Sequence, residues 1–358
     1  MARASLSILA LFGALAGGAI MQPAAACARV DVPAQSAPPP AERVLPGHAR
    51  FDLERADITA FVDHMVGLGL SREAVYATLA KAEPQPKIID AMNKPAEKAL
   101  AWYEYRARFL APERVDAGAR LWREHRELLD AIAMERHVDP EYLLGIVGVE
   151  TYFGRLQGRF HVLDALATLA FDYPPRGEYF RRELEQFLLM TQDGEIDVQS
   201  ALGSYAGAMG AAQFMPSSFQ KFAIAANGSG RPDLWSNWAD IFGSVANYLG
   251  QHGWIFGQPV MAEAELGTAP APVPAASVTL DSTLGALRDR GMQVTSALDP
   301  DTPCTVVPAQ QSDNTVSYRV GFKNFYVITR YNRSPMYAMA VHDLAQAIAA
   351  RVLAPDAP

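Results

Sequence analysis

Apolar residues recur at intervals of three and four along most of the chain, a period typical of amphipathic helices. In the segment 51–110 the first helix is carried by Ile58, Phe61, Val62, Met65 and Val66. Ser71 is placed to cap a second helix, which Pro84 and Pro86 are expected to end. The N-terminal part of the folded body is therefore predicted to be helical.

The same spacing predicts further helices along the chain. They cover Ala111–Arg136, Leu163–Phe171, Glu178–Met190, Ile241–Tyr248, Leu284–Arg290 and Met336–Leu353. Asp164 is expected to act as an N-terminal cap. Arg181 and Glu185 stand four residues apart, so we expect them to pair on a solvated face, with Glu178 and Glu183 beside them.

The pattern changes between residues 259 and 320. Pro259–Ala276 is rich in Ala and Pro and is expected to be a loop. Alternating apolar and polar residues then predict strands at Ser277–Leu280, Thr305–Val307 and Thr315–Val320, with Phe325–Thr329 as an extension. We therefore predict a mainly α chain with a small β subdomain over about residues 259–320.

One charged side chain interrupts the most apolar helical segment. Glu150 is the only charged residue in Tyr142–Gly154, a run that follows Asp139 as N-cap and Pro140 at the first helical position. Its helical face is shared by Leu143, Ile146 and Val147.

Loss of water on such a face disfavours the charged form of a carboxyl group. Glu150 is therefore a candidate general acid, able to hold a proton and deliver it to a leaving group. The alternative interpretation is a solvated glutamate at a frayed helix end. Helical spacing leaves both interpretations open.

The first residues are expected to direct export. Arg3 precedes the apolar stretch Leu6–Met21, and three alanines at 24–26 provide a processing site, which predicts a signal peptide over residues 1–26. Cys27 follows directly, and the sequence around it resembles a bacterial lipobox with Ala24 in place of the usual leucine. A lipidated Cys27 would anchor the protein to the outer membrane, whereas ordinary cleavage would leave it free in the periplasm.

Residues 27–47 are rich in Pro and Ala and are expected to form an extended spacer, followed by a folded body over 48–353 and a tail over 354–358. The net charge of -8 argues against a nucleic-acid partner, since such proteins usually carry a basic excess. Half of the residues are hydrophobic and a fifth are charged, which is typical of a globular protein.

Long motifs give the chain a family resemblance. The segment GSYAGAMGAAQFMPSSF at Gly203–Phe219 resembles the signature of lytic murein transglycosylases. The chain as a whole is similar to the membrane-bound lytic murein transglycosylase B family over about Phe51–Ala349. Four further motifs carry the resemblance: GVETYFGR (148–155), LDALATLAFDYP (163–174), GSVANYL (243–249) and FYVITRYNRS (325–334).

The resemblance implies a lysozyme-like helical core, a further helical region and a small β subdomain lining a substrate groove. It implies a lyase that cuts peptidoglycan glycan strands between N-acetylmuramic acid and N-acetylglucosamine. The product carries a 1,6-anhydromuramoyl end. We expect no cofactor and no metal in this chain. The family's catalytic glutamate falls on Glu150. The resemblance specifies no protein partner.

The resemblance also assigns substrate-binding residues one by one. They are Ser204, Gln213, Tyr248, Tyr331, Asn332, Tyr337 and Arg176. Packing aromatics, a helix cap at Ser204 and a solvated Arg176 are the corresponding structural alternatives. Met209, Phe214 and Met215 of the signature are expected in the core.

Ordinary glycosidases need two carboxyl groups, and here only Glu150 has the apolar setting of a catalytic acid. Asp172 is the least explained of the other acids. A hydrolase on the same scaffold and a non-catalytic peptidoglycan-binding protein are the competing functions.

Some family members carry an EF-hand-like calcium loop at the position of Ala225–Trp235. Ala225 and Ser229 stand where that pattern has acidic ligands, which leaves Asn227 and Asp240 as oxygen donors. Since calcium needs six to eight oxygen ligands, we expect a plain glycine-rich turn without a tight calcium site.

Overall fold

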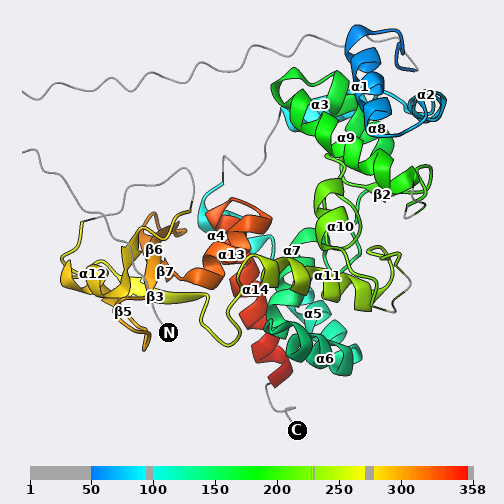
Figure 1. The fold of residues 1–358 in the computed structure, drawn as a ribbon. Coiled ribbons are helices and arrows are strands. Elements are labelled where there is room, and N and C mark those ends of the chain that lie inside the picture. Colours follow the sequence, from blue (N-terminus) through cyan, green and yellow to red (C-terminus); the bar gives the residue numbers. More distant parts are fainter. Residues whose placement is uncertain are drawn as a thin grey trace, which may run out of the picture. The chain divides into compact units, whose positions relative to one another are not determined.

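The computed structural model describes residues 50–93, 100–192, 194, 196–226, 228, 230–270 and 278–353 (Figure 1). The predicted signal peptide, Cys27, the spacer and the tail lie outside these residues, as do Ser277, Asn227 and Ser229. Within the described ranges, no helix combines the length and the apolar character that crossing a membrane requires. The fold is mainly helical with a small sheet, as predicted.

The N-terminal region is helical as predicted, with four helices where the sequence pattern predicted two. They are α1 (Ala56–Gly67), α2 (Arg72–Leu79), α3 (Pro86–Met92) and α4 (Trp102–Ala107). The cap at Ser71 is confirmed, because its hydroxyl accepts the backbone N–H of Ala74 at 3.4 Å. The prediction that Pro86 ends the second helix is wrong. Pro86 instead begins α3, where the missing N–H of proline leaves no helical bond unmade.

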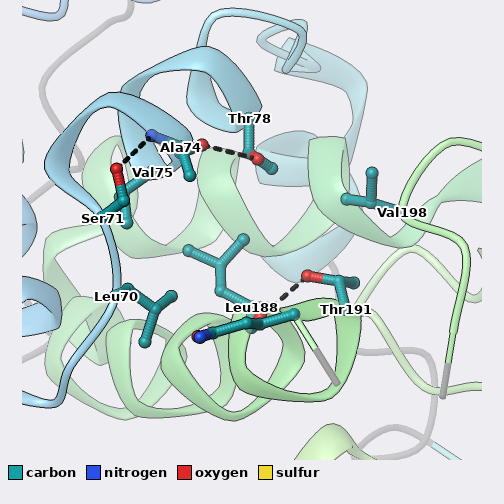
Figure 2. Close-up of a pocket in the computed structure, with 9 residues that line it drawn as sticks. Leu70, Ser71, Ala74, Val75, Thr78, Leu188, Thr191 and Val198 are labelled. Carbon is teal, nitrogen blue, oxygen red and sulfur yellow. Dashed lines mark hydrogen bonds between the residues drawn. The ribbon is translucent and has the colours of Figure 1, made fainter. Parts of the chain in front are cut away.

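A pocket of about 300 Å³ lies between the α2 region and α9 (Gly177–Gln192). Figure 2 shows the residues that line it. Its lining is mainly apolar, with Leu70, Val75 and Leu188 among its walls. The hydroxyls of Thr78 and Thr191 donate to backbone carbonyls of their own helices, at 2.9 and 2.8 Å. The polar groups at this pocket therefore serve local structure.

The single helix expected over 111–136 is two helices. Helix α5 (Pro112–Glu124) and helix α6 (Arg126–Arg136) meet at His125, whose φ and ψ of -113° and 26° lie outside the helical region. The two halves pack on different partners, α5 on α14 (Pro335–Leu353) and α6 on α11 (Trp238–Gln251). Tertiary packing therefore breaks a helix that local spacing leaves continuous.

The central helices are α7 (Pro140–Thr151), α8 (Val162–Phe171), α9 and α10 (Pro216–Phe222), with a 3-10 turn η2 at Pro174–Arg176. The short strands β1 (Phe160–His161) and β2 (Leu202–Gly203) pair between them. Asp139 and Pro140 open α7 as predicted. Helices α7 and α14 lie in close contact, because a Cβ at Gly145 would stand only 2.8 Å from the carbonyl oxygen of Val341.

The pair expected between Arg181 and Glu185 does not form. Arg181 donates instead to a backbone carbonyl of α8 at 2.8 Å, and Glu185 contacts His64 at 2.9 Å. The i, i+4 ion pair on α9 joins Arg182 to Glu178 at 2.6 Å. The charges of this helix therefore connect it to its neighbours as well as facing solvent.

Two acids, Glu183, predicted on a solvated face, and Asp164, predicted as a helix cap, are buried. Glu183 is only 4% exposed, and its carboxylate accepts the N–H and the hydroxyl of Ser217 at 2.9 and 2.8 Å. Asp164 lies inside the first turn of α8 and accepts the backbone N–H of Glu83 at 2.8 Å, so its prediction as an N-cap is wrong. Each carboxylate satisfies backbone donors of another segment, which offsets the cost of its burial.

The β subdomain is an antiparallel sheet in the order β4-β6-β7-β3-β5. Its strands are β3 (Met261–Glu265), β4 (Ser282–Thr283), β5 (Gln293–Val294), β6 (Pro303–Gln310) and β7 (Val316–Gly321), with helix α12 (Leu284–Asp289) between β4 and β5. Strand β3 lies inside the predicted loop. No strand forms at 278–280, and 325–329 is helical within α13 (Lys323–Tyr331), so those predictions are wrong.

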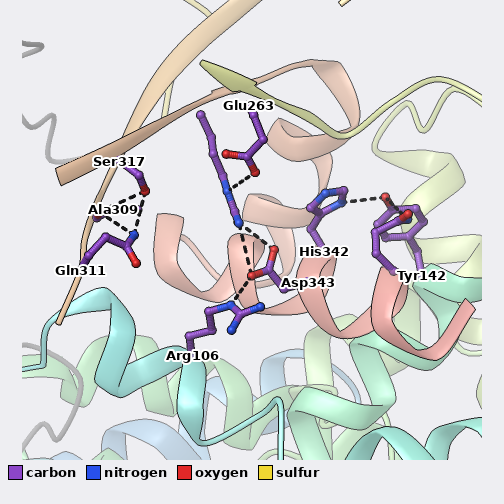
Figure 3. A network of polar contacts seen from close by, with 10 residues as sticks. Arg106, Tyr142, Glu263, Ala309, Gln311, Ser317, His342 and Asp343 are labelled. Atoms are coloured by element: carbon purple, nitrogen blue, oxygen red, sulfur yellow. Dashed lines mark hydrogen bonds and ion pairs between the residues drawn. The ribbon is translucent and has the colours of Figure 1, made fainter. Parts of the chain in front are cut away.

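Charged side chains tie this sheet to the helices (Figure 3). Asp343 on α14 accepts Arg106 of α4 and Arg319 of β7, both at 2.7 Å. Arg319 also pairs with Glu263 of β3 at 2.9 Å. Because Asp343 is buried, its bonds to two arginines are needed to offset its desolvation.

Candidate active site

A pocket of about 360 Å³ opens beside the C-terminal end of α7. Six of the residues singled out from the sequence line it: Glu150, Ser204, Gln213, Tyr248, Tyr331 and Asn332. They come from α7, from α11, from the end of α13 and from the loop Ser204–Met215, here called the signature loop, which follows β2. The fold thus gathers segments that lie up to 182 positions apart in the sequence, from 150 to 332.

The last turn of α7 positions Glu150. Three successive residues behind it adopt left-handed conformations, Tyr152, Phe153 and Gly154, with φ of 51°, 57° and 75°. A left-handed conformation costs a non-glycine residue about 1 kcal/mol. These left-handed residues end α7 at Thr151, so Glu150 stands in the last turn of the helix.

Thr151 fixes this tip to the signature loop. Its buried hydroxyl donates to the carbonyl of Ala211 at 2.8 Å and accepts the N–H of Gly154 at 3.0 Å. Arg114 of α5 donates to the carbonyl of Gly148 at 2.8 Å, which also accepts the backbone N–H of Tyr152 at 3.2 Å. The backbone that carries Glu150 is therefore held from both sides.

Glu150 is half-buried and accepts a hydrogen bond from the Tyr337 hydroxyl at 2.6 Å. Tyr337 is 2% exposed and lies on α14. Burial, followed by the nearby charge of Glu150, raises its pKa well above the ordinary value, so its hydroxyl stays a donor at neutral pH. Glu150 lines the pocket, whereas Tyr337, which holds its carboxyl group, does not.

The signature loop supplies polar atoms opposite Glu150. The Ser204 oxygen accepts the N–H groups of Ala206 and Ala208 at 3.3 and 3.1 Å, which leaves its hydrogen free to donate. Ser204 closes a turn after β2, so the helix cap considered as its alternative does not occur. Gln213, at a φ of 52°, donates to Gly210 at 2.9 Å.

The tyrosine hydroxyls at this pocket bind the protein backbone. Tyr248 donates to the carbonyl of Arg330 and Tyr331 to that of Ala212, both at 2.6 Å. Their rings pack on each other, with centroids 4.6 Å apart. Burial raises the pKa of Tyr248 to about 12, so it also remains a donor. These tyrosines therefore present ring surface to the pocket.

Asn332 and Arg176 differ in their placement. The Asn332 oxygen accepts the N–H of Ser334 at 3.0 Å, which leaves the amide nitrogen for the pocket. Arg176 is exposed in η2, over the rings of Tyr179 and Phe180 at 4.5 and 4.9 Å, and does not line this pocket. A substrate contact at Arg176 stays a prediction.

Met209 and Phe214 are buried, as expected, whereas Met215 is half-buried and lines the pocket. Sequence reasoning missed Tyr205, which lines the pocket with 44% of its surface exposed. The available signal was its position inside the signature, directly after Ser204.

The loop that corresponds to the calcium loop is closed by Asp240. Its buried carboxylate accepts the N–H groups of Ala226 and Asp233 at 2.7 and 2.8 Å. Both carboxylate oxygens thus accept backbone N–H groups. The described residues contain no group of three or more His, Cys, Asp or Glu side chains that could bind a metal ion. Calcium prefers six to eight oxygens, and two further candidate donors of this loop, Asn227 and Ser229, lie outside the described residues. The lack of tight calcium binding itself stays a prediction.

Comparison with known proteins places this geometry in a family. The model of the transglycosylase SLT domain matches residues 54–346. The chain is 39% identical over 299 residues to membrane-bound lytic murein transglycosylase B of Escherichia coli strain K12, covering 81% of each protein. The chain therefore belongs to the transglycosylase SLT family and is a lytic transglycosylase.

Solved structures agree with this assignment. Soluble lytic transglycosylase SltB1 from Pseudomonas aeruginosa is 42% identical, with a TM-score of 0.75 over 82% of this chain and 97% of that one. SltB3 from the same organism, solved in complex with NAG-NAM-pentapeptide, is 28% identical, with a TM-score of 0.72 over 81% of this chain and 78% of that one.

Proposed function

We propose that this enzyme cleaves peptidoglycan between N-acetylmuramic acid and N-acetylglucosamine, with the pocket at Glu150 as its active site. The observation that carries the proposal is a single carboxyl group at the tip of a buried helix, held by Tyr337 and facing a pocket. The relative named for murein and the structure that holds NAG-NAM-pentapeptide support this substrate class.

Glu150 is the one carboxyl group among the described residues that line this pocket. Asp172, the acid that sequence left least explained, pairs with Arg55 at 2.6 Å and does not line it. Glycosidases with two carboxyl groups place them about 5 to 10 Å apart across the reacting bond. A mechanism with one carboxyl group therefore needs the substrate to supply the second reacting group.

The reaction begins with protonated Glu150. It gives its proton to the glycosidic oxygen, and the bond between that oxygen and C1 of the muramic acid breaks. The oxygen of the substrate's 2-acetamido group then bonds to C1 and stabilises the cationic carbon. Such substrate assistance is a known exception to the use of two carboxylates.

The second step restores Glu150. Its carboxylate removes the proton of the C6 hydroxyl, O6 bonds to C1, and the acetamido oxygen leaves. The products are a free N-acetylglucosamine hydroxyl and a 1,6-anhydromuramoyl end, with no water added. Tyr337 contributes by donating to the carboxylate between the two proton transfers.

The remaining residues of the pocket have matching chemistry. The Ser204 hydroxyl and the amide of Asn332 are suited to the acetamido and hydroxyl groups of a sugar. The rings of Tyr248 and Tyr331 offer apolar surface to a pyranose face. Together they would orient the strand so that its glycosidic oxygen meets Glu150.

The test is digestion of purified sacculi, with released fragments identified by mass. Wild type is expected to release anhydro fragments, and E150Q to lose activity by a factor of about 10² to 10⁴, because general acid catalysis contributes that much. E141Q is the matched control, since Glu141 lies at the other end of the same helix and outside the pocket.

Three outcomes contradict this scheme. Near wild-type release of anhydro fragments by E150Q would exclude Glu150 as the acid. Fragments heavier by one water would identify a hydrolase. Binding to sacculi without any released fragment would identify a non-catalytic binding protein.

We also propose that the enzyme works in the periplasm, with residues 1–26 removed and Cys27 lipidated as an outer-membrane anchor. The lipobox-like sequence and the name of the membrane-bound relative support this. The mass of the mature N-terminal peptide tests it. An unmodified Cys27 in the membrane-free fraction would show that no lipid is attached.

A further inference from the structure

We propose that a second pocket, bordered by Leu202 and Trp235, binds the peptidoglycan glycan strand beyond the sugars held at Glu150. The pocket measures about 490 Å³, more than the pocket at Glu150. This inference rests on the proposed function and extends it to a second binding region on the same strand.

The two pockets are lined by neighbouring residues. Leu202 lines the second pocket and Ser204, two residues later, lines the first, so their Cα atoms are at most about 7 Å apart. Gln157 makes a second connection. Its amide donates to the carbonyl of Trp235 at 2.8 Å, and its own carbonyl accepts the Gln213 amide at 3.1 Å. The two pockets therefore lie next to each other.

Trp235 is a fixed, half-buried wall. Its indole N–H donates to the carbonyl of Leu202 at 2.8 Å, and its backbone N–H donates to Asp233 at 2.8 Å. Its ring packs on Phe219, with centroids 6.1 Å apart. An aromatic group held in this way loses little conformational freedom when a ligand binds, so more of the contact energy appears as affinity.

The surface of this pocket suits a sugar. Leu202, which is 39% exposed, lies beside Trp235, and both offer apolar area to the C–H face of a pyranose ring. Tyr205 is exposed just past β2 and continues this area into the Glu150 pocket. Apolar area is thus available at both pockets.

The charged groups can accept hydrogen bonds from hydroxyl and amide donors. Asp197 and Asp233 line the pocket with Arg231. Each aspartate accepts bonds from its own turn, yet a carboxylate has about four acceptor positions. The N-acetylated sugars of a glycan strand carry such hydroxyl and amide donors.

The test is calorimetric binding of peptide-free glycan strands of four, six and eight sugars to the full chain bearing E150Q. We expect affinity to rise with length, by about fivefold or more, once a strand reaches the second pocket, which corresponds to one favourable aromatic or apolar contact. Adding L202D should remove this gain and leave four-sugar binding unchanged. L68D is the matched control, because Leu68 is an exposed leucine that lines neither pocket.

A second variant, S200W, fills the pocket from its exposed rim and should also remove the gain. Equal affinity for all lengths, or a gain that survives both L202D and S200W, overturns this inference. A gain seen only with strands that carry stem peptides would make the pocket a peptide site and would overturn it as well. Failure to bind even four sugars would instead contradict the proposed function.

Discussion

Tyr337 donates its hydroxyl hydrogen to Glu150 at 2.6 Å, although the two residues lie 187 positions apart in the sequence. The bond joins the tip of α7 to the first turns of α14, two helices that pack along each other. Hydrogen bonds to ionised groups contribute about 1.5 to 3 kcal/mol each. The contact therefore stabilises the ionised form of Glu150.

Y337F should lower kcat by a factor of about 10 to 100, because it removes that bond and retains the ring. KM should change little, since Tyr337 does not line the pocket. The measurement is steady-state release of fragments from sacculi. Y326F, on α13 and outside the pocket, is the control. A wild-type kcat for Y337F would show that the bond is not used in catalysis.

R114Q should weaken the support of the helix that carries Glu150. Arg114 donates to the carbonyl of Gly148 and lies 4.4 Å from the ring centre of Tyr152. Loss of both contacts should lower the free energy of unfolding by about 1 to 2 kcal/mol.

A drop in kcat at unchanged KM should accompany that loss, because the position of Glu150 and not substrate affinity is affected. Urea unfolding and kinetics on one preparation measure both quantities. R120Q, an exposed arginine of the same helix, should leave both unchanged. Destabilisation without any effect on kcat would reduce Arg114 to a structural role.

D240N should destabilise the protein by about 2 to 4 kcal/mol, since the buried carboxylate accepts two backbone N–H groups and an amide cannot accept both equally well. Calcium should not change the melting temperature of wild type or restore that of D240N. D130N, on the exposed face of α6, is the control. A clear calcium-dependent rise in melting temperature would contradict our interpretation of the loop.

His342 should make stability depend on pH. Burial, with a smaller contribution from Arg319, lowers its pKa from 6.5 to about 4, against the opposing charge of Asp343. Its Nδ1 accepts the hydroxyl of Tyr142 at 2.8 Å, in keeping with a neutral ring. Between pH 6.5 and 4 the unfolded chain binds a proton that the folded chain does not.

Stability is therefore complete above pH 6.5 and falls as the pH drops toward 4, by about 3 kcal/mol in total. H342Q retains an acceptor for Tyr142 and should lose less stability than wild type between pH 7 and 4.5. Urea unfolding at both pH values measures this difference. H137N, at an exposed left-handed position that asparagine tolerates, should behave as wild type. Equal pH profiles for H342Q and wild type would exclude His342 as the source.

Local pattern was sufficient where an element's own spacing decides its structure. The helices that carry Glu150 and Tyr337 follow from apolar spacing, and the cap at Ser71 follows from its side chain. Glu150 stood out because one charge interrupts an apolar face. What no spacing shows is the partner across the fold, so neither Tyr337 as its donor nor Tyr205 in the pocket follows from period alone.

The wrong predictions share a cause in long-range contacts. Glu183 reads as a surface acid because its partner, Ser217, lies 34 residues away. Strand β3 alternates alanine with glutamate, but both residues are uncommon in strands, and its pairing is set by β5 and β7, which follow much later in the chain. His125 carries no helix-breaking chemistry, yet the helix ends there because its halves pack on different elements.

Helix α14 holds two contacts of different kinds six residues apart, about 9 Å along its axis. Tyr337 donates a hydrogen bond to the carboxyl group of Glu150, and Asp343 accepts one from Arg319 of the sheet. Because the helix between them is rigid, an axial slide that loosens one contact also lengthens the other. A change in the sheet that shifts α14 along its axis would therefore also disturb the bond between Tyr337 and Glu150.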